Sequence, residues 1–162
     1  MLKGLKSLIV KLKKAVIAIY GERLISFVIF GSVGRRTATS ESDIDILIIA
    51  DNLPRGRMAR VKEFEKVEEV LAKDLEKLYK KGIYLSLSPV IKTKEEVLLG
   101  SPLFLDMIDD ALIIFDRNKF FNNYLEKFKD RLNRLGAKRI NLGSYWYWIL
   151  KSDYKLGEVF EI

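Results

Sequence analysis

The chain has 162 residues, of which 49% are apolar, and it carries a formal net charge of +7. This length suits one domain with a continuous core and is too short for two ordinary domains, so we expect a single globular unit. The sequence contains no cysteine and no histidine, which excludes disulfides, thiolate catalysis and imidazole bases. Any chemistry must therefore rest on carboxylates, hydroxyls and cations, and a bound metal would be a hard ion such as Mg²⁺ or Mn²⁺.

The distribution of charge and apolar residues argues against a membrane protein. No uninterrupted apolar run approaches the roughly 18 residues that a membrane span requires, and lysines interrupt the apolar residues near the start of the chain. We expect a cytoplasmic protein without a membrane partner. Lys and Arg are interleaved with Asp and Glu, a pattern typical of a charged soluble surface and of thermophile proteins, although the net charge would also suit a polyanion such as RNA.

The first half of the chain predicts helices alternating with strands. Apolar residues recur at helical spacing through residues 2–20, which indicates an amphipathic helix. Leu24–Phe30 is typical of a buried strand that leads into a tight turn, with a short helix expected near residues 33–38. Asp43–Ala50 predicts a second strand covered on both faces, and residues 57–81 predict the longest helix.

The middle of the chain completes the predicted sheet. Ile83–Ile91 alternates apolar and polar side chains until Pro89, which indicates a third strand at an edge or a bend. Residues 93–110 predict short helical turns, and Ala111–Phe115 a short strand. These elements predict an α/β (α+β) fold in which a small mixed central sheet is flanked by helices, with the core spanning residues 1–115.

The last part of the chain, residues 116–162, predicts a helix and a β-hairpin packed on that core. Asp116 is placed to cap the helix and Gly136 to end it. Lys138 to Leu150 is typical of a hairpin with a two-residue turn. Its aromatic run, Tyr145–Trp148, could stack on nucleobases, but a hairpin that buries one aromatic face is the more common arrangement.

The sequence places two small polar motifs between the first two strands. Gly31-Ser32 is separated by ten residues from Asp43-Ile44-Asp45. A glycine lets backbone approach a phosphate closely, and the serine hydroxyl and successive amides can donate to its oxygens. Aspartates two apart on a strand lie on one face about 6–7 Å apart, where their carboxylates can converge on a divalent ion. A protein that handles a nucleoside triphosphate needs a phosphate site and a metal site close together, and the two motifs predict both at one edge of the sheet.

Two arginines lie in the same connection. Arg35 and Arg36 follow the glycine-serine turn, and their guanidinium forks could grip phosphate or neutralise developing charge. Each of these signals is common by itself in proteins. Their combination is more informative, because the turn follows one strand, the aspartates open the next, and the connection is short.

The stretch GSVGRRTATSESDIDILII, residues 31–49, resembles the DNA polymerase β-like nucleotidyltransferase superfamily, in particular its minimal nucleotidyltransferases of archaeal type. Their signature is Gly-Ser, ten residues and Asp-x-Asp, which this stretch fits without gaps. The resemblance covers residues 1–115 in element order and implies the polymerase β-like fold. It also implies transfer of a nucleoside monophosphate from a nucleoside triphosphate, with ATP expected first, to an acceptor hydroxyl or phosphate, with Mg²⁺ required.

The resemblance assigns expected roles by position. Gly31 and Ser32 would hold the triphosphate, and Asp43 and Asp45 would bind the metal and support catalysis. Arg35 corresponds to an arginine common after the turn. Arg36 stands where glycine is frequent, and we count it with the nucleotide-binding residues.

The sequence departs from the family at a third carboxylate, which active members usually carry on the next core strand. The matching face of Ile83–Ile91 offers Tyr84, Ser86 and Ser88. Another carboxylate would have to come from elsewhere, and the candidates are Asp106, Asp109 and Asp110. The alternative is a degenerate nucleotide-binding module with weak or no turnover.

The resemblance also suggests partners. Minimal nucleotidyltransferases are often the antitoxin of a helical ribonuclease toxin, and some adenylylate it. A helical, toxin-like partner protein or an RNA acceptor is therefore expected beside the nucleoside triphosphate. A plain RNA-binding protein that uses the basic surface is a lower-ranked alternative.

Overall fold

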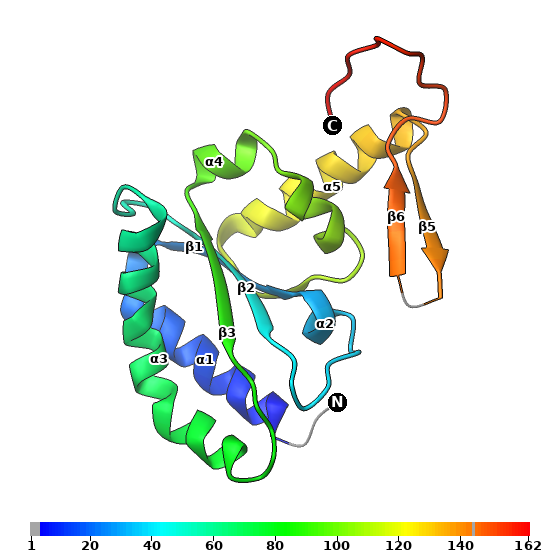
Figure 1. The fold of residues 1–162 in the computed structure, drawn as a ribbon. Helices are drawn as coiled ribbons and strands as arrows, with labels where there is room; N and C mark the ends of the chain where they lie inside the picture. The colour runs from blue at the N-terminus through cyan, green and yellow to red at the C-terminus, as the bar shows by residue number, and fades with distance from the viewer. Residues whose placement is uncertain (1–3, 144) are drawn as a thin grey trace. The chain divides into compact units, whose positions relative to one another are not determined.

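The computed structural model describes residues 4–143 and 145–162, and Figure 1 shows the arrangement of their helices and strands. In chain order the elements are α1 (Leu5–Tyr20), η1 (Gly21–Arg23), β1 (Leu24–Phe30), α2 (Gly31–Gly34), β2 (Ile44–Ala50), α3 (Arg57–Tyr79), β3 (Leu87–Lys92), α4 (Lys94–Leu98), η2 (Pro102–Met107), β4 (Leu112–Asp116), η3 (Arg117–Lys119), α5 (Phe120–Arg134), β5 (Lys138–Leu142) and β6 (Tyr145–Ile149). Leu2 of the expected first helix and Ser144 of the expected hairpin turn lie outside the described residues.

A four-stranded mixed sheet forms the centre of the fold, with the strand order β3-β2-β1-β4. β1 runs antiparallel to both β2 and β4, whereas β2 and β3 are parallel and joined by the long helix α3. The predicted α+β class with a small mixed sheet is confirmed. Because β1 and β2 are antiparallel neighbours, the end of β1 and the start of β2 lie at the same end of the sheet.

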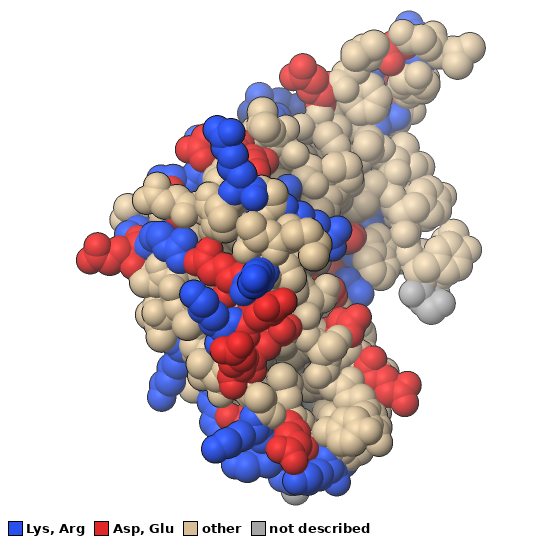
Figure 2. Space-filling view, turned by 60° about the vertical axis from the view of Figure 1, so that its left-hand side comes forward, with Lys and Arg blue, Asp and Glu red and all other residues tan. Residues whose placement is uncertain are grey.

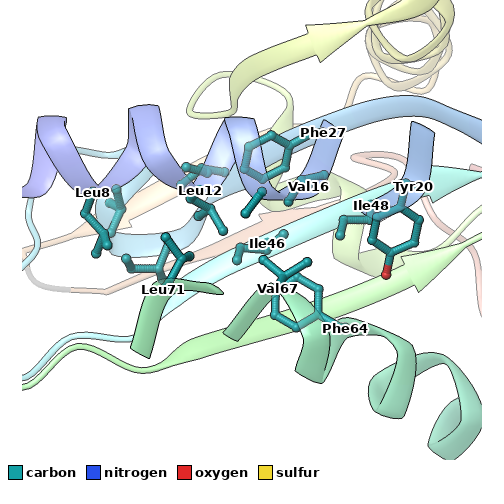
Figure 3. Packing of buried hydrophobic residues seen from close by; sticks show 14 of the residues in the cluster. Leu8, Leu12, Val16, Tyr20, Phe27, Ile46, Ile48, Phe64, Val67 and Leu71 are labelled. Carbon is teal, nitrogen blue, oxygen red and sulfur yellow. The ribbon is translucent and has the colours of Figure 1, made fainter. Parts of the chain in front are cut away.

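The core lies between this sheet and the helices α1 and α3 (Figure 3). α1 contributes Leu8, Leu12 and Val16 from one face, as its helical spacing predicts. Phe27 of β1 and Phe64 of α3 are also buried. Each such side chain contributes roughly 1.5–3 kcal/mol through removal of its apolar surface from water. The two central strands carry almost only buried residues, and this packing fixes their register.

Three local predictions are wrong in detail. The third strand begins at Leu87 rather than Ile83, because β2 begins at Ile44 and pairs first with Leu87. The short helix spans Gly31–Gly34 instead of residues 33–38, because the Gly31 carbonyl already accepts from the Arg35 amide. Met58, expected on the apolar face of α3, is 79% exposed, because it lies in the first turn of that helix.

β3 is an edge strand, as Pro89 predicts. Proline has no amide proton, so this position cannot donate to a further strand. The guanidinium of Arg60 donates to the carbonyl of Ile91, with 3.1 Å between Nη1 and the oxygen. Two backbone positions on this strand are therefore closed to strand addition.

The chain divides into two compact units, Met1–Asn122 and Asn123–Ile162. The second unit contains most of α5 and the β5-β6 hairpin, whose two strands are antiparallel as predicted. The expected division into residues 1–115 and 116–162, packed as one unit, stays a prediction. The Asp116 carboxylate accepts from the amides of Phe121 and Asn122, each at 3.0 Å, and so caps the start of α5.

The surface carries mixed charges. On the face shown in Figure 2, lysines and arginines alternate with aspartates and glutamates. Across residues 4–143 and 145–162, no helix is both long and apolar enough to span a membrane.

Candidate active site

The two sequence motifs meet where β1 ends and β2 begins. Phe30, the last residue of β1, pairs directly with Asp45 in the antiparallel ladder. Gly31 follows Phe30, so the glycine-serine turn starts beside the second aspartate of Asp43-Ile44-Asp45. The sheet register thus brings together residues that are more than ten positions apart in the sequence.

Gly31 is in close contact with Asp45. Its φ of +63° is in the left-handed region, which glycine adopts without strain. A Cβ at this position would lie 1.9 Å from Oδ2 of Asp45. A side chain at residue 31 would therefore displace the Asp45 carboxylate. Both the positive φ and this steric contact favour glycine at residue 31.

Asp43 is held by a different segment. The hydroxyl of Ser86 donates a hydrogen bond to Oδ1 of Asp43. The Ser86 carbonyl accepts from the amide of Ile44 at 2.8 Å, which fixes the serine beside the start of β2. Ser88 lies opposite Asp45 in the parallel ladder. Ser86 and Ser88, on the face where active members of the family usually carry a third carboxylate, thus lie next to the two aspartates.

The two aspartates differ in environment. Asp43 is exposed, whereas Asp45 is half-buried. Burial raises the pKa of Asp45 above its ordinary value, and the neighbouring Asp43 carboxylate raises it further. The Arg35 guanidinium lowers the pKa of Asp45 and so offsets part of the increase, whereas Asp106 raises it. Excess negative charge at Asp45 would be relieved by a cation bound there.

Ser32 lies within α2, and Arg35 and Arg36 follow that helix directly. The Ser32 carbonyl accepts from the Thr37 amide at 2.9 Å. Its hydroxyl has no hydrogen-bond partner in the described part of the chain. Arg35 acts electrostatically on Asp45. Arg36 is exposed and has a φ of +62°. This conformation favours glycine, the residue that is frequent at this position in the family that the stretch resembles.

A third carboxylate is not assembled here. Among residues 4–143 and 145–162, no group of three or more aspartates and glutamates is close enough to hold a metal ion. Of the three candidates, Asp106 in η2 acts electrostatically on Asp45. The backbone of Asp110 packs against α2, since its carbonyl oxygen would lie 2.4 Å from a Cβ on Gly34. Asp109 is exposed.

Sequence reasoning missed the role of Ser86. The alternation of Tyr84, Ser86 and Ser88 placed these side chains on one face, and their exposure agrees with that. What the pattern could not supply was the register of residues 83–86, which lie before β3. The amide of Tyr84 donates to the carbonyl of Ser40 at 2.6 Å, so this segment pairs with the loop before Asp43.

Comparison with known proteins agrees with this geometry. Residues 9–99 match the family model described as a nucleotidyltransferase domain. The chain belongs to the nucleotidyltransferase family. A relative from Methanocaldococcus jannaschii named "Putative protein adenylyltransferase MJ1305" is 37% identical over 129 residues, which are 78% of this nucleotidyltransferase and 82% of the relative. The predicted family and enzyme class are confirmed.

Solved structures similar to this nucleotidyltransferase are more distant. A toxin–antitoxin crystallised with AMP-PNP is 18% identical, with a TM-score of 0.47 over 80% of this chain and 87% of that chain. A mutant of the toxin–antitoxin MntA-HpeT is 17% identical, with a TM-score of 0.49 over 83% of this chain and 90% of that chain. Likenesses of this size say nothing of the ligands or partners of this nucleotidyltransferase.

Proposed function

We propose that this nucleotidyltransferase moves a nucleoside monophosphate from a nucleoside triphosphate to an acceptor on a protein or an RNA, with ATP as the favoured donor. The observation that carries the proposal is the contact of Gly31 with Asp45, which sets the phosphate-binding turn against the metal-binding pair. The 37% identical relative is named as a protein adenylyltransferase. That name favours ATP as the donor and a protein as the acceptor.

The donor set fits a divalent metal. Asp43 and Asp45 present carboxylate oxygens, the ligands that hard ions prefer. Mg²⁺ commonly uses only one or two protein carboxylates together with phosphates of the substrate, so the missing third carboxylate does not prevent binding. Burial is the main cause of the raised pKa of Asp45, and the neighbouring Asp43 carboxylate adds to it, so a cation bound here would favour the charged form of both aspartates. Mg²⁺ or Mn²⁺ held by these two residues would neutralise charge on the transferring phosphate.

The remaining residues would bind and orient the triphosphate. The Ser32 hydroxyl and the amides of the turn would donate to phosphate oxygens, which approach closely because residue 31 is glycine. Arg35 and Arg36 would supply guanidinium donors to the outer phosphates. Ser86 would hold one oxygen of Asp43 and leave the other toward the ion.

Transfer of label tests this function. Wild-type protein is incubated with ATP labelled on the α-phosphate, Mg²⁺ or Mn²⁺, and candidate protein or RNA acceptors. We expect label on the acceptor from wild type and at least a ~10²-fold loss in Asp43→Asn/Asp45→Asn, because both metal-binding carboxylates are removed. Equal labelling by wild type and the double variant would show that the aspartates have no part in transfer.

A second candidate function follows from the absence of a three-carboxylate cluster in the described residues. In it the protein binds a metal-nucleotide complex with weak or no turnover and acts as an antitoxin-like partner of a helical ribonuclease. The discriminating measurement is nucleotide binding without transfer: calorimetry with ATP and Mg²⁺ would give saturable binding that needs both aspartates, while no acceptor becomes labelled. Measurable turnover that depends on Asp43 and Asp45 would exclude it.

A further inference from the structure

A pocket lies beside β3, the edge strand of the sheet. It has a volume of about 510 Å³ and is lined by Gly56, Arg57, Arg60, Val61, Pro89, Val90, Ile91, Lys92 and Glu96. These residues come from the start of α3, the end of β3 and α4, which lie together in Figure 1. The lining follows β3 from Pro89, which pairs with Ile46 of β2, to Lys92, which pairs with Ile49. None of the candidate active-site residues lines this pocket, so we treat it as a separate candidate site.

Two of the charged residues in the pocket are balanced by each other. Nη1 of Arg60 lies 2.7 Å from Oε2 of Glu96. The same guanidinium donates to the carbonyls of Pro54 at 2.9 Å and Ile91 at 3.1 Å. Arg60 is thus already engaged by the protein, and the Arg60–Glu96 pair adds no net charge to the pocket.

The other two cations are not balanced in this way. Within residues 4–143 and 145–162, neither Arg57 nor Lys92 has a hydrogen bond or an ion pair to a carboxylate. Lys94, the next cation along the chain, is paired with Asp51 at 3.5 Å. Lys92 acts electrostatically on Glu96 as well. The lining holds three cations (Arg57, Arg60 and Lys92) and one carboxylate (Glu96), which leaves a surplus of two positive charges.

The rest of the lining is apolar. Val61 of α3 faces the pocket together with Val90 and Ile91 of β3, and these three side chains are only partly buried by the protein itself. Binding pockets for small molecules combine an apolar lining with a few convergent polar groups that orient the ligand. Here the polar groups are cations, so the ligand must bring negative charge at one end and an apolar body at the other.

We propose that this pocket binds a small organic phosphomonoester. A phosphomonoester is close to a dianion at neutral pH, which matches the surplus of two positive charges, whereas a carboxylate offers only one charge. Guanidinium forks bind phosphate oxygens in pairs, and an ammonium acts as a point charge beside them. The apolar lining fits the organic part. This site goes beyond the proposed transfer reaction and does not depend on it.

Binding of phenyl phosphate, inorganic phosphate and phenol tests the pocket. The three probes are titrated into Asp43→Asn/Asp45→Asn protein in EDTA, so that metal-dependent binding of phosphate at the active site is removed. NMR of methyl groups reports the location through Val61 and Val90. We expect phenyl phosphate to bind at least about fivefold more tightly than phosphate or phenol, because only it uses both the cations and the apolar wall.

Matched variants distinguish binding in this pocket from nonspecific electrostatic attraction of anions to a basic protein. Arg57→Ala/Lys92→Ala should raise the dissociation constant for phenyl phosphate at least about tenfold, as expected for loss of two direct charge contacts. Lys66→Ala/Lys73→Ala removes the same charge from exposed positions of α3, the helix that carries Arg57. This variant should change the dissociation constant for phenyl phosphate less than about twofold.

A gain of binding is also expected. Glu96→Gln removes the carboxylate from the pocket lining and should lower the dissociation constant for phenyl phosphate. Three outcomes would overturn the proposal: no saturable binding at millimolar phenyl phosphate, equal losses in the two double-alanine variants, or methyl shifts absent from Val61 and Val90. Circular dichroism of each variant verifies that the fold is retained.

Discussion

A methyl group added to Gly31 would lie 1.9 Å from Oδ2 of Asp45. The glycine-serine turn and Asp45 are therefore one steric unit rather than two neighbouring motifs. The contact exists because the last residue of β1 pairs with Asp45. It leaves no room for any side chain at residue 31, whatever the chemistry of the reaction.

This contact predicts the effect of Gly31→Ala. The new methyl group displaces the Asp45 carboxylate, and a misplacement of about 1 Å typically costs on the order of 10²-fold in rate. Gly82→Ala is the matched control, because Gly82 also has a positive φ of +75°, but a methyl group there would meet nothing within 4 Å. Both variants should lose stability in thermal melts, Gly31→Ala the more because of its additional clash with Asp45, while only Gly31→Ala should lose transfer of labelled nucleotide. Equal activity losses would attribute the effect to backbone strain.

Ser86→Ala tests the hydrogen bond to Asp43. Removal of a partner that orients a metal ligand typically costs about 10–100-fold in metal affinity or activity, so we expect transfer to need a higher Mn²⁺ concentration. Ser88→Ala is the control, since Ser88 lies two residues further on, in β3 opposite Asp45, and has no hydrogen bond to a side chain in the described residues. The metal dependence of the rate distinguishes them. Unchanged metal dependence in Ser86→Ala would mean that the bond does not position Asp43.

Asp45→Asn should stabilise the metal-free protein at neutral pH. Because the pKa of Asp45 is raised in the folded state, the folded protein holds this proton more tightly than the unfolded chain does. The resulting contribution to stability is complete below the ordinary value of 3.8 and is lost as the pH rises through the folded pKa. The variant should therefore melt roughly 1–3 °C higher than wild type at pH 7. Scanning calorimetry in EDTA at pH 4 and pH 7 measures the difference, and a lower melting temperature at pH 7 would contradict it.

Glu96→Gln should have the opposite pH dependence. The hydrogen bond from Arg60 lowers the pKa of Glu96, and the amide of Thr93 in the capping box of α4 lowers it further. A lowered pKa gives stability that is present above the ordinary value of 4.5 and is lost as the pH falls through the folded pKa. We expect the variant to be about 0.5–1 kcal/mol less stable than wild type at pH 7. Urea unfolding should show the two proteins converging in acid, and a gap that persists there would indicate a packing effect instead.

Arg36→Gly separates the backbone of this position from its side chain. A left-handed conformation costs a residue with a side chain about 1–2 kcal/mol, part of which glycine regains at the expense of a more flexible unfolded chain. Stability should therefore stay equal or rise slightly, while the Michaelis constant for ATP rises if the guanidinium binds phosphate. Unchanged ATP dependence would remove Arg36 from the nucleotide-binding residues.

The sequence predicted the elements whose patterns are long and local. Leu24–Phe30 forms β1 over the whole expected range, because its short run of apolar residues, interrupted only by Ser26 and followed by a glycine, favours a buried strand. The spacing of Gly31-Ser32 and Asp43-Ile44-Asp45 predicted one shared site, and the register of β1 and β2 places both motifs at the same end of the sheet.

What the sequence could not supply depends on contacts between distant segments. Residues 83–86 alternate like a strand, yet Tyr84 bonds to the loop at Ser40 and Ser86 to Asp43. No local pattern specifies those partners. The electrostatic effect of Asp106 on Asp45 likewise depends on where η2 packs against the sheet, which is decided by the folded chain and not by the spacing of acidic residues.

The edge of β3 has a consequence for the behaviour of the protein in concentrated solution. An open sheet edge is a template on which identical chains can pair and aggregate. Pro89 withholds an amide and Arg60 occupies the carbonyl of Ile91, so a second molecule finds neither a complete row of donors nor a complete row of acceptors. A short, partly closed edge of this kind disfavours pairing of two molecules through β3 when the protein is abundant.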